Sequence, residues 1–252
     1  MSRIALLSDV HGNATALAAV LEELVGSDLD VLVCLGDIAA GGPQPREVVA
    51  RLRELRCTTV RGNADGWLTE GFPSGSSVET RRLSEIVEWA RERLGPGEHE
   101  YLASLPATAR ISSGQTSVLC FHGSPRSETE RLLATTPESE IEEALVDAKP
   151  ANVLAGGHTH LQLFRRVGER LLVNPGSVGL PLGSLRARSG GPPLPTWAEY
   201  ALLDYEGDVE VAITFRRVAV DTEALAEPTA SMPHGTWAAD LEQRIKRWNR
   251  RG

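Results

Sequence analysis

Short β-type runs alternate with segments of helical periodicity along most of this sequence. The runs are Ile4–Ser8, Val31–Leu35, Thr58–Arg61, Ser117–Phe121, Asn152–Ala155 and Leu171–Val173. Between the first two, Leu17, Val20, Leu21 and Leu24 have the spacing of one helix face. Strands that alternate with helices are typical of a layered α/β fold. This alternation is the strongest constraint that the sequence places on its own folding.

The same patterns predict four helices and a terminal hairpin. The helices cover Ala14–Leu24 with Asn13 as N-cap, a segment after Pro45, Glu79–Leu94 and Glu138–Ala148. From Trp197 the residues alternate around a Glu206-Gly207-Asp208 turn, which predicts a hairpin at the edge of a second sheet.

The C-terminal part of the chain contains two expected loops and a last helix. Gly183–Pro195 is rich in Gly, Pro and Arg, and we expect it, like Glu227–Pro233, to be a loop. The predicted helix over Thr236–Arg250 carries an apolar stripe of Trp237, Leu241, Ile245 and Trp248. Such a stripe favours packing within the molecule over a partner surface.

Length and charge limit the architecture and the partners. A chain of 252 residues can bury one substantial core, and we expect a single domain over 1–252. It has 26 Lys and Arg against 34 Asp and Glu, a net charge of −8, and its basic run is Lys246, Arg247, Arg250 and Arg251. This balance predicts no non-specific binding to nucleic acid, although a single nucleotide remains compatible.

Cysteine spacing and hydropathy indicate the compartment. Cys34, Cys57 and Cys120 lie far apart and form no CxxC pair, which predicts reduced core cysteines. The chain enters its first apolar run without a signal-peptide region, and no apolar stretch has membrane-spanning length. We therefore expect a cytoplasmic protein that does not bind a membrane.

The most informative feature is the set of residues that follow the apolar runs. They are Asp9-Val-His11, Gly36-Asp37, Gly62-Asn63, His122-Gly123 and Gly156-Gly-His158-Thr-His160. Ligands of open α/β sheets bind beyond the carboxyl ends of the strands. The sequence therefore predicts that seven side chains converge there: Asp9, His11, Asp37, Asn63, His122, His158 and His160.

These seven side chains have the chemistry of metal ligands. Residues two apart after a strand point in the same direction, as the Asp9/His11 and His158/His160 pairs do. Four imidazoles, two carboxylates and one amide oxygen suit Mn, Fe, Zn, Ni or Co better than Mg or Ca. Seven ligands exceed the needs of one ion, which favours two ions that share a carboxylate.

Each motif also has a structural explanation when it is taken alone. Asp-x-His after a strand is typically a capping pair, Gly-Asp and Gly-Asn are typical turns, and His-Gly is usually a hydrogen-bonded loop histidine. However, four of the six histidines lie at these strand ends. That coincidence favours a metal site.

The ordered motifs resemble the signature of the calcineurin-like metallophosphoesterase superfamily, which reads D-x-H, G-D, G-N-H-[DE], H and G-H-x-H. The resemblance runs from Ile4 to about Val218. It is closest in style to small prokaryotic predicted phosphoesterases, which share Ser8-Asp-Val-His-Gly-Asn13, His122-Gly-Ser-Pro125 and Asn174-Pro-Gly-Ser177. It implies an α/β fold of four layers, an αββα sandwich of mixed sheets with the site at the sheet edge, here followed by a C-terminal hairpin and helix.

The resemblance also implies how the ligands are shared and what they do. Asp9, His11 and His160 would hold the first ion, Asn63, His122 and His158 the second, and Asp37 would bridge them. A metal-bound hydroxide would attack the phosphorus of a small phosphodiester, or of a monoester or nucleotide. We expect two divalent ions, with manganese ahead of Fe, Zn, Ni or Co. We also expect backbone N–H groups at the Asn13 end of the first helix to face the anion.

Two positions depart from the signature. Ala64 stands where the family usually has a histidine that protonates the leaving group, and Ala40 replaces an acid. General-acid help is worth about 10²- to 10⁴-fold, so esters with good leaving groups should be favoured. Related small phosphoesterases also lack this histidine. Asp65 or His234 would be a substitute acid, although Asp65 also fits a plain turn, and His234 and His99 fit solvent-facing positions.

Other features leave alternatives open. Arg126 would contact a substrate phosphate bidentately or be an exposed loop arginine. The loops Trp67–Ser77, Ser124–Pro137 and Gly183–Pro195 would shape the pocket, but they carry no recognisable specificity code.

A rival to the hydrolase is a non-catalytic metal-binding scaffold on the same fold, as in the retromer subunit that resembles these phosphoesterases. The complete ligand set favours the enzyme.

Overall fold

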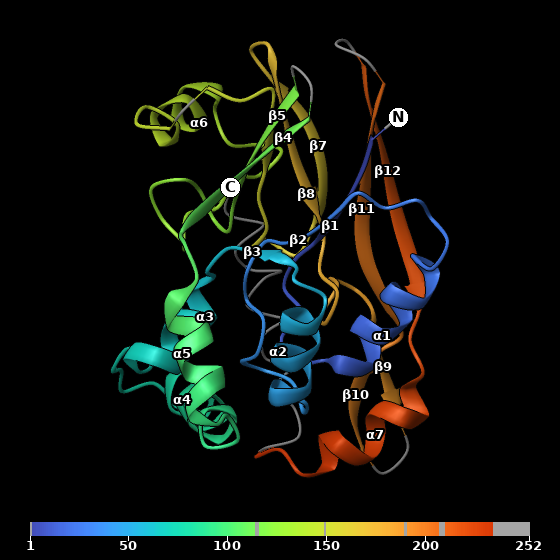
Figure 1. The fold of residues 1–252 in the computed structure, drawn as a ribbon. Coiled ribbons are helices and arrows are strands. Elements are labelled where there is room, and N and C mark those ends of the chain that lie inside the picture. Colours follow the sequence, from blue (N-terminus) through green and yellow to red (C-terminus); the bar gives the residue numbers. More distant parts are fainter. Residues whose placement is uncertain (1, 114–115, 149, 189–190, 207–209, 234–252) are drawn as a thin grey trace.

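Two five-stranded mixed sheets form the centre of the computed structural model, which describes residues 2–113, 116–148, 150–188, 191–206 and 210–233 (Figure 1). The first sheet has the spatial order β12 (Glu210–Ala219), β11 (Trp197–Glu206), β1 (Ser2–Leu7), β2 (Val31–Cys34) and β3 (Thr58–Thr59). The second has the order β4 (Thr108–Ser113), β5 (Thr116–Phe121), β6 (Val153–Ala155), β8 (Arg170–Pro175) and β7 (Gln162–Val167). In each sheet three adjacent strands are parallel, β1, β2 and β3 in the first and β5, β6 and β8 in the second.

The alternation of side chains along the strands builds the layers. Ile4 and Leu6 of β1 lie in the apolar cluster between the two sheets, together with Val118 of β5. Ala5 and Leu7 face the opposite way, into the core that the first sheet shares with helices. Residues of β5 alternate likewise between the middle core and an outer one. Three cores therefore separate four layers, and the predicted αββα sandwich is confirmed.

Helices cover the outer face of each sheet. The helices on the first sheet are α1 (Ala14–Glu23), α2 (Pro45–Glu54), α3 (Asn63–Glu70), α4 (Val78–Arg91), α5 (Pro96–Ser104) and α7 (Thr222–Ala230), and α6 (Glu138–Ala144) covers the second. The predicted N-cap of α1 is confirmed, since the Asn13 side chain accepts from the Ala16 N–H at 2.9 Å. Within the described ranges, each helix is too short or too polar to cross a lipid bilayer.

Several predicted elements differ from the structure. The hairpin of β11 and β12 is not in a second sheet: β11 pairs antiparallel with β1, and β12 is the outer strand of that same sheet. The apolar residues of β11 alternate between the middle core and the helical core, as those of β1 do. The pattern predicted a strand correctly but carried no information about its neighbour.

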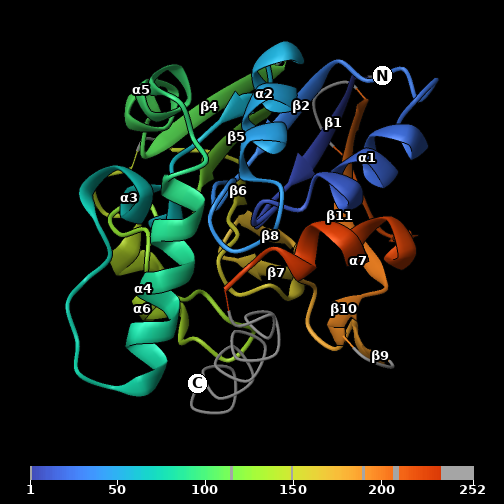
Figure 2. The ribbon, with the colours of Figure 1, turned by 90° about the horizontal axis from the view of Figure 1, so that it is seen from below.

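Two predicted loops contain regular structure. Gly183–Pro195 forms the hairpin of β9 (Leu185–Arg188) and β10 (Gly191–Pro195), and its register shifts between Gly191 and Leu194, where prolines interrupt the pairing. Residues 227–230 belong to α7, whose N-terminus is capped by the Asp221 carboxylate and which includes Pro228. Figure 2 shows α7 beside this hairpin, and α7 contacts β10.

The remaining differences are shorter. The strand predicted over Thr58–Arg61 is limited to two residues, and α3 includes the start of the expected loop Trp67–Ser77. The strands β4 and β7 and the helices α3 and α5 were not predicted. The predicted last helix over Thr236–Arg250, with its apolar stripe, and most of the turn after Glu206 lie outside the described residues.

Truncation of Leu6 to alanine tests the middle core. Leu6 is fully buried between the sheets, so Leu6→Ala should lower the free energy of unfolding by about 3 kcal/mol in urea denaturation. Val25 is a matched apolar control because 81% of it is exposed, and Val25→Ala should change the stability by less than about 0.5 kcal/mol. Equal effects of the two substitutions would contradict this layer assignment.

Candidate metal centre

The residues after β1, β2, β5 and β6 bring six side chains together in two triads. Asp9, His11 and His160 form the first triad, and Asp37, His122 and His158 form the second. In each triad one potential ligand atom per residue lies within 4.8 Å of the others. All six side chains belong to buried residues. Asp9 and His160, which are 151 positions apart in the sequence, thus meet where the strands of both sheets end.

Short distances join the ligand atoms within and between the triads. In the first triad His160 Nε2 lies 3.1 Å from Asp9 Oδ1 and 3.1 Å from His11 Nε2. In the second, His122 Nε2 lies 3.4 Å from Asp37 Oδ2. The same Asp37 oxygen is 3.8 Å from His11 Nε2. Asp37 therefore lies between imidazoles of both triads, which is where a shared carboxylate is needed.

Backbone carbonyls orient three of the imidazoles. The Nδ1 atoms of His11, His122 and His160 lie 2.8, 2.6 and 2.7 Å from the carbonyl oxygens of Ala40, Leu35 and Leu180. A carbonyl oxygen only accepts, so each Nδ1 donates its proton, and the neutral ring then presents an Nε2 lone pair. Metal-binding histidines are oriented in this way.

The backbone at the strand ends adopts an uncommon conformation. Five of the seven predicted ligands have a positive φ: Asp9 at 53°, His11 at 48°, Asp37 at 54°, His158 at 67° and His160 at 56°. Aspartate and histidine tolerate the left-handed region better than most residues, yet each such position costs about 1 to 3 kcal/mol. Backbone strain of this kind concentrates at functional sites.

Hydrogen bonds between the loops hold this strained backbone. Asp9 N–H donates to the Gly36 carbonyl at 3.0 Å, and His11 N–H donates to the Asp37 carbonyl at 2.9 Å. The Asp9 Oδ2 atom accepts from the His158 N–H at 3.0 Å and from the Ser8 hydroxyl at 2.6 Å. The loops therefore fix one another, and no ligand position is set by its own strand alone.

Among the described residues, four buried side-chain atoms have no hydrogen-bond partner, and one of them is the Tyr205 hydroxyl of the middle core. The other three belong to predicted metal ligands and are Asp9 Oδ1, Asn63 Oδ1 and His122 Nε2. Burial of such atoms is costly unless something else satisfies them. The first belongs to one triad, the third belongs to the other, and all three are lone-pair donors to a cation. The donor chemistry of the site therefore fits bound metal ions.

Within the second triad, charge and burial shift the pKa values of the two imidazoles in opposite directions. Burial disfavours protonation of His122, but Asp37 and Asp9 outweigh it and raise the pKa of His122 to about 10. Burial and the neighbouring His122 lower the pKa of His158 to about 4. Burial disfavours ionisation of Asp9, but the imidazole of His160 and its neighbours hold the pKa of this carboxyl below its usual range. The carboxylates thus stay ionised and ready to bind a cation.

Asp65 is a structural clamp and not the turn residue that the sequence suggested. It lies in the first turn of α3, fully buried, and its carboxylate accepts from the N–H groups of Asp37, Ile38 and Gly62 at 2.8 to 2.9 Å. Burial and the charge of Asp37 raise the pKa of Asp65 to about 7. Its oxygens thus hold the Asp37 loop against the start of α3. The sequence signal for this role was an acid three residues after Gly62 at a helix start.

Two positioning residues, Asn174 and Ser177, were not assigned a role from sequence. The Asn174 amide donates to the Gly157 carbonyl at 2.6 Å, on the loop that carries His158 and His160. The buried Ser177 hydroxyl donates to the Asp9 carbonyl at 2.8 Å and accepts from the Leu180 N–H at 2.8 Å. Since the Leu180 carbonyl binds His160 Nδ1, Ser177 links two members of the first triad.

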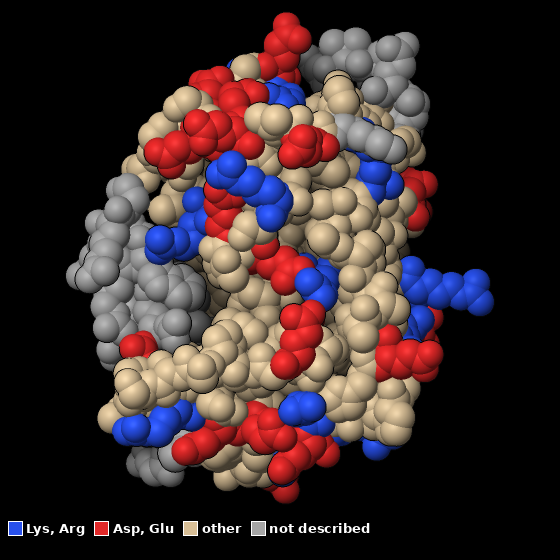
Figure 3. Space-filling view, turned by 90° about the vertical axis from the view of Figure 1, so that its left-hand side faces the viewer, with Lys and Arg blue, Asp and Glu red and all other residues tan. Residues whose placement is uncertain are grey.

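The other candidate residues do not converge on the triads. Arg126 forms a two-point ion pair with Glu130 and is about half exposed. On the face drawn in Figure 3, basic side chains lie among acidic ones and form no separate basic field. The start of α1 is bonded within the protein, because Gln44 and Asn13 accept from the N–H groups of Thr15 and Ala16. His99 is partly buried, with Nε2 3.1 Å from the Arg91 carbonyl.

Residues 2–206 match the calcineurin-like phosphoesterase superfamily domain. The chain belongs to this superfamily. Phosphodiesterase YfcE of Escherichia coli K12 is 30% identical over 200 residues, which cover 75% of this chain and 86% of YfcE. The resemblance predicted from the motifs is confirmed, and the chain is a phosphoesterase, a hydrolase that acts on phosphoester bonds. Its family is metal-dependent, and membership implies a small phosphate-ester substrate.

Solved structures agree with the family assignment. A metallophosphoesterase from Sphaerobacter thermophilus has a TM-score of 0.71 at 27% identity, and the match covers 97% of this chain and 98% of that chain. The hypothetical protein PH1004 from Pyrococcus horikoshii OT3 has a TM-score of 0.74 at 24% identity, with 93% and 95% covered. The second likeness concerns the fold alone.

Removal of the Ser177 hydroxyl tests whether the loops of the phosphoesterase position its ligands. Ser177→Ala should weaken Mn²⁺ binding about 10- to 100-fold, because it removes one bond to the Asp9 backbone and one to Leu180. Isothermal titration of the metal-free protein measures the change. Ser104→Ala is the control, since the exposed Ser104 hydroxyl bonds only within its own helix. Unchanged affinity in Ser177→Ala would refute a positioning role.

Proposed function

We propose that this phosphoesterase hydrolyses small phosphodiesters with two divalent cations held by the seven side chains at the strand ends. Asp9, His11 and His160 would hold the first cation, Asn63, His122 and His158 would hold the second, and Asp37 would be shared between them. The observation that carries this proposal is the set of buried acceptors without partners, which are distributed over both triads and Asn63. The mixed nitrogen and oxygen donors favour manganese, with Fe, Zn, Ni and Co as the metals that the same donors accept.

The protein's own groups prepare the site for this reaction. Bound divalent cations supply Lewis acidity, which activates water and offsets charge on the phosphoryl oxygens. Buried loops hold the ligands, and carbonyl groups accept the Nδ1 protons of three imidazoles, so that their Nε2 atoms face the other ligands of each triad. Asp37 uses its second oxygen to accept from the Ala64 N–H at 2.7 Å, which fixes the orientation of the carboxylate. Pre-set ligands reduce the reorganisation that binding and reaction require.

No side chain at position 64 can protonate a leaving group. Ala64 is 1% exposed and lies in the core beneath the first sheet. Neighbouring Asp65 is occupied with three backbone N–H groups, which argues against its use as the acid. The other candidate, His234, lies outside the described residues. The proposal therefore favours esters whose leaving group departs without a proton.

Metal removal and reconstitution test the proposed function. Chelator-treated protein should not hydrolyse bis-p-nitrophenyl phosphate, and added Mn²⁺ should restore turnover. Asp37→Asn should reduce kcat/KM by at least about 10²-fold, because an amide bridges two cations poorly. The same assay with p-nitrophenyl phosphate compares diester and monoester. Absence of metal-dependent turnover of either ester would favour the scaffold alternative.

The leaving group should control the rate strongly. Replacement of an aryl leaving group by an alkyl leaving group lowers kcat in any such enzyme. Without a general acid the decrease should be larger by about 10²- to 10⁴-fold, since general-acid help is worth that much. Rates for a series of aryl methyl phosphates of rising phenol pKa, with an alkyl diester at its end, measure this dependence. Rates independent of the leaving group would show that another residue donates the proton or that another step limits turnover.

A further inference from the structure

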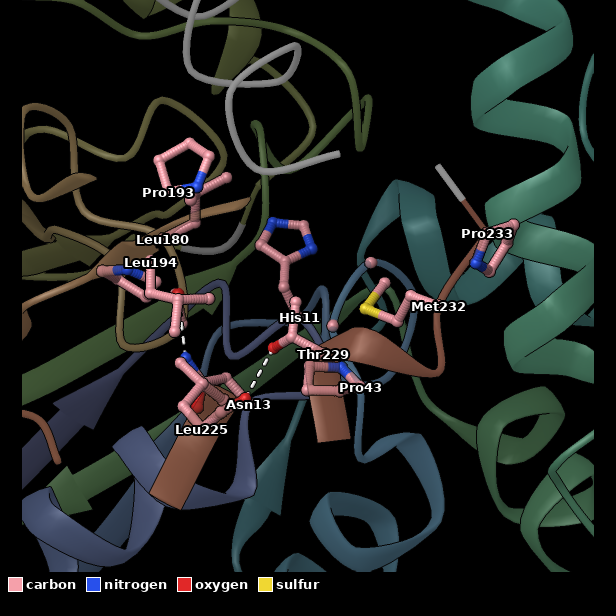
Figure 4. A pocket seen from close by; sticks show the side chains of 14 residues that line it. His11, Asn13, Pro43, Leu180, Pro193, Leu194, Leu225, Thr229, Met232 and Pro233 are labelled. Atoms are coloured by element: carbon pink, nitrogen blue, oxygen red, sulfur yellow. Dashed lines mark hydrogen bonds between the residues drawn. The ribbon is translucent and has the colours of Figure 1, made fainter. Parts of the chain in front are cut away.

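An apolar pocket adjoins the first triad and contains the His11 side chain in its wall (Figure 4). Its other walls come from the segment 41–43, the segment 179–180, β10, α7 and the residues after α7. The volume open to the centre of a water-sized sphere is about 40 Å³, which is room for a few water molecules or a few carbon atoms. None of the described residues that line it is Asp, Glu, Lys or Arg.

The polar side chains of this pocket are already bonded within the protein. The Asn13 amide donates to the Gly179 carbonyl at 3.2 Å, and its oxygen accepts from the Ala16 N–H. The Thr229 hydroxyl donates to the Leu225 carbonyl at 2.7 Å. A hydroxyl or charged group that entered would lose hydrogen bonds to water, and these two side chains would not replace them.

The remaining walls are mostly carbon. Leu180, Leu194, Leu225 and Met232 are buried around the pocket, and Pro43 and Pro193 complete it. Apolar groups gain free energy in such surroundings roughly in proportion to the area that they remove from water. The pocket therefore selects for apolar groups, and its volume selects for small ones.

The pocket shares two residues with the surroundings of the first triad. His11 is both a member of the triad and part of the wall. Leu180 lines the pocket, while its carbonyl accepts from His160 Nδ1 at 2.7 Å. A substituent on a phosphorus atom held beside the first triad can therefore reach the pocket directly.

We propose that this pocket binds a small apolar substituent of the substrate, such as a short alkyl group joined to phosphorus through an ester oxygen. This inference rests on the proposed function and deepens it, because it gives one of the two ester groups of the diester a defined chemistry. A sugar, a nucleoside or a polyphosphate is larger than the pocket, and the described residues that line it include no Asp, Glu, Lys or Arg that would bind one. The specificity-determining residues are Leu194, Leu225 and Met232.

A series of diesters with one leaving group tests the pocket. The substrates are the methyl, ethyl, propyl and 2-hydroxyethyl p-nitrophenyl phosphates, assayed with Mn²⁺. One water molecule adds to phosphorus and releases a proton to solvent, the bond to the nitrophenyl oxygen breaks, and p-nitrophenolate leaves with the bonding electron pair, so the alkyl group remains on the monoester product. We expect kcat/KM to rise up to about fourfold for each buried methylene and to fall for the 2-hydroxyethyl ester relative to the propyl ester.

Variants of Met232 connect this trend to the pocket. Met232→Ala widens the pocket and should shift the best substrate to a longer alkyl chain, whereas the volume-conserving Met232→Leu should keep the order of substrates. Phe164→Ala, at a residue that is 54% exposed on β7, should leave the order unchanged. Thermal melting of each variant shows whether it folds. The substrate series with the wild-type protein tests the pocket independently of the variants.

The outcomes separate the two claims. Turnover of all four esters at equal kcat/KM, or an unchanged chain-length order in folded Met232→Ala, would overturn the pocket assignment and leave the phosphodiesterase proposal intact. Absence of metal-dependent turnover for every ester would overturn both.

Discussion

The left-handed backbone at Asp9, His11, Asp37, His158 and His160 is the constraint on which the site depends. Each conformation is unfavourable by about 1 to 3 kcal/mol in isolation, and it persists because neighbouring loops bond one another. The loops of both sheets bring their side chains together in this conformation, and the two triads result. Two triads form only when all of these loops are in place, so the site is a property of the complete sandwich and not of any one motif.

The same arrangement couples folding to metal binding. Buried carboxylates, imidazoles and an amide leave acceptors without partners in the protein alone. A cation that binds the folded chain and not the unfolded chain stabilises it by mass action. We infer that Asp65, Asn174 and Ser177 fix the loops before the cation binds, since each forms a hydrogen bond to the backbone of a loop that carries ligands.

The sequence predicted a layered fold and the residues that form the site, but it did not predict the hydrogen bonds that hold those residues in place. Strands that alternate with helices predicted the layered α/β fold, the family resemblance predicted its four layers, and the residues after each strand predicted the cluster around Asp37. Periodicity could not show that β11 pairs with β1, because pairing partners depend on contacts far apart in the chain. Prolines concealed the β9–β10 hairpin and the end of α7. Asp65 resembled a turn residue because its partners are backbone N–H groups, which every residue but proline carries.

The central claim is that these loops hold two cations side by side in a single buried site. A crystal of the protein grown with Mn²⁺ and measured at the manganese absorption edge tests it most directly. We expect two anomalous peaks, one within each triad, with Asp37 in contact with both and Asn63 in contact with the second. Absence of both peaks, or triad side chains that point away from one another in the crystal, would contradict it.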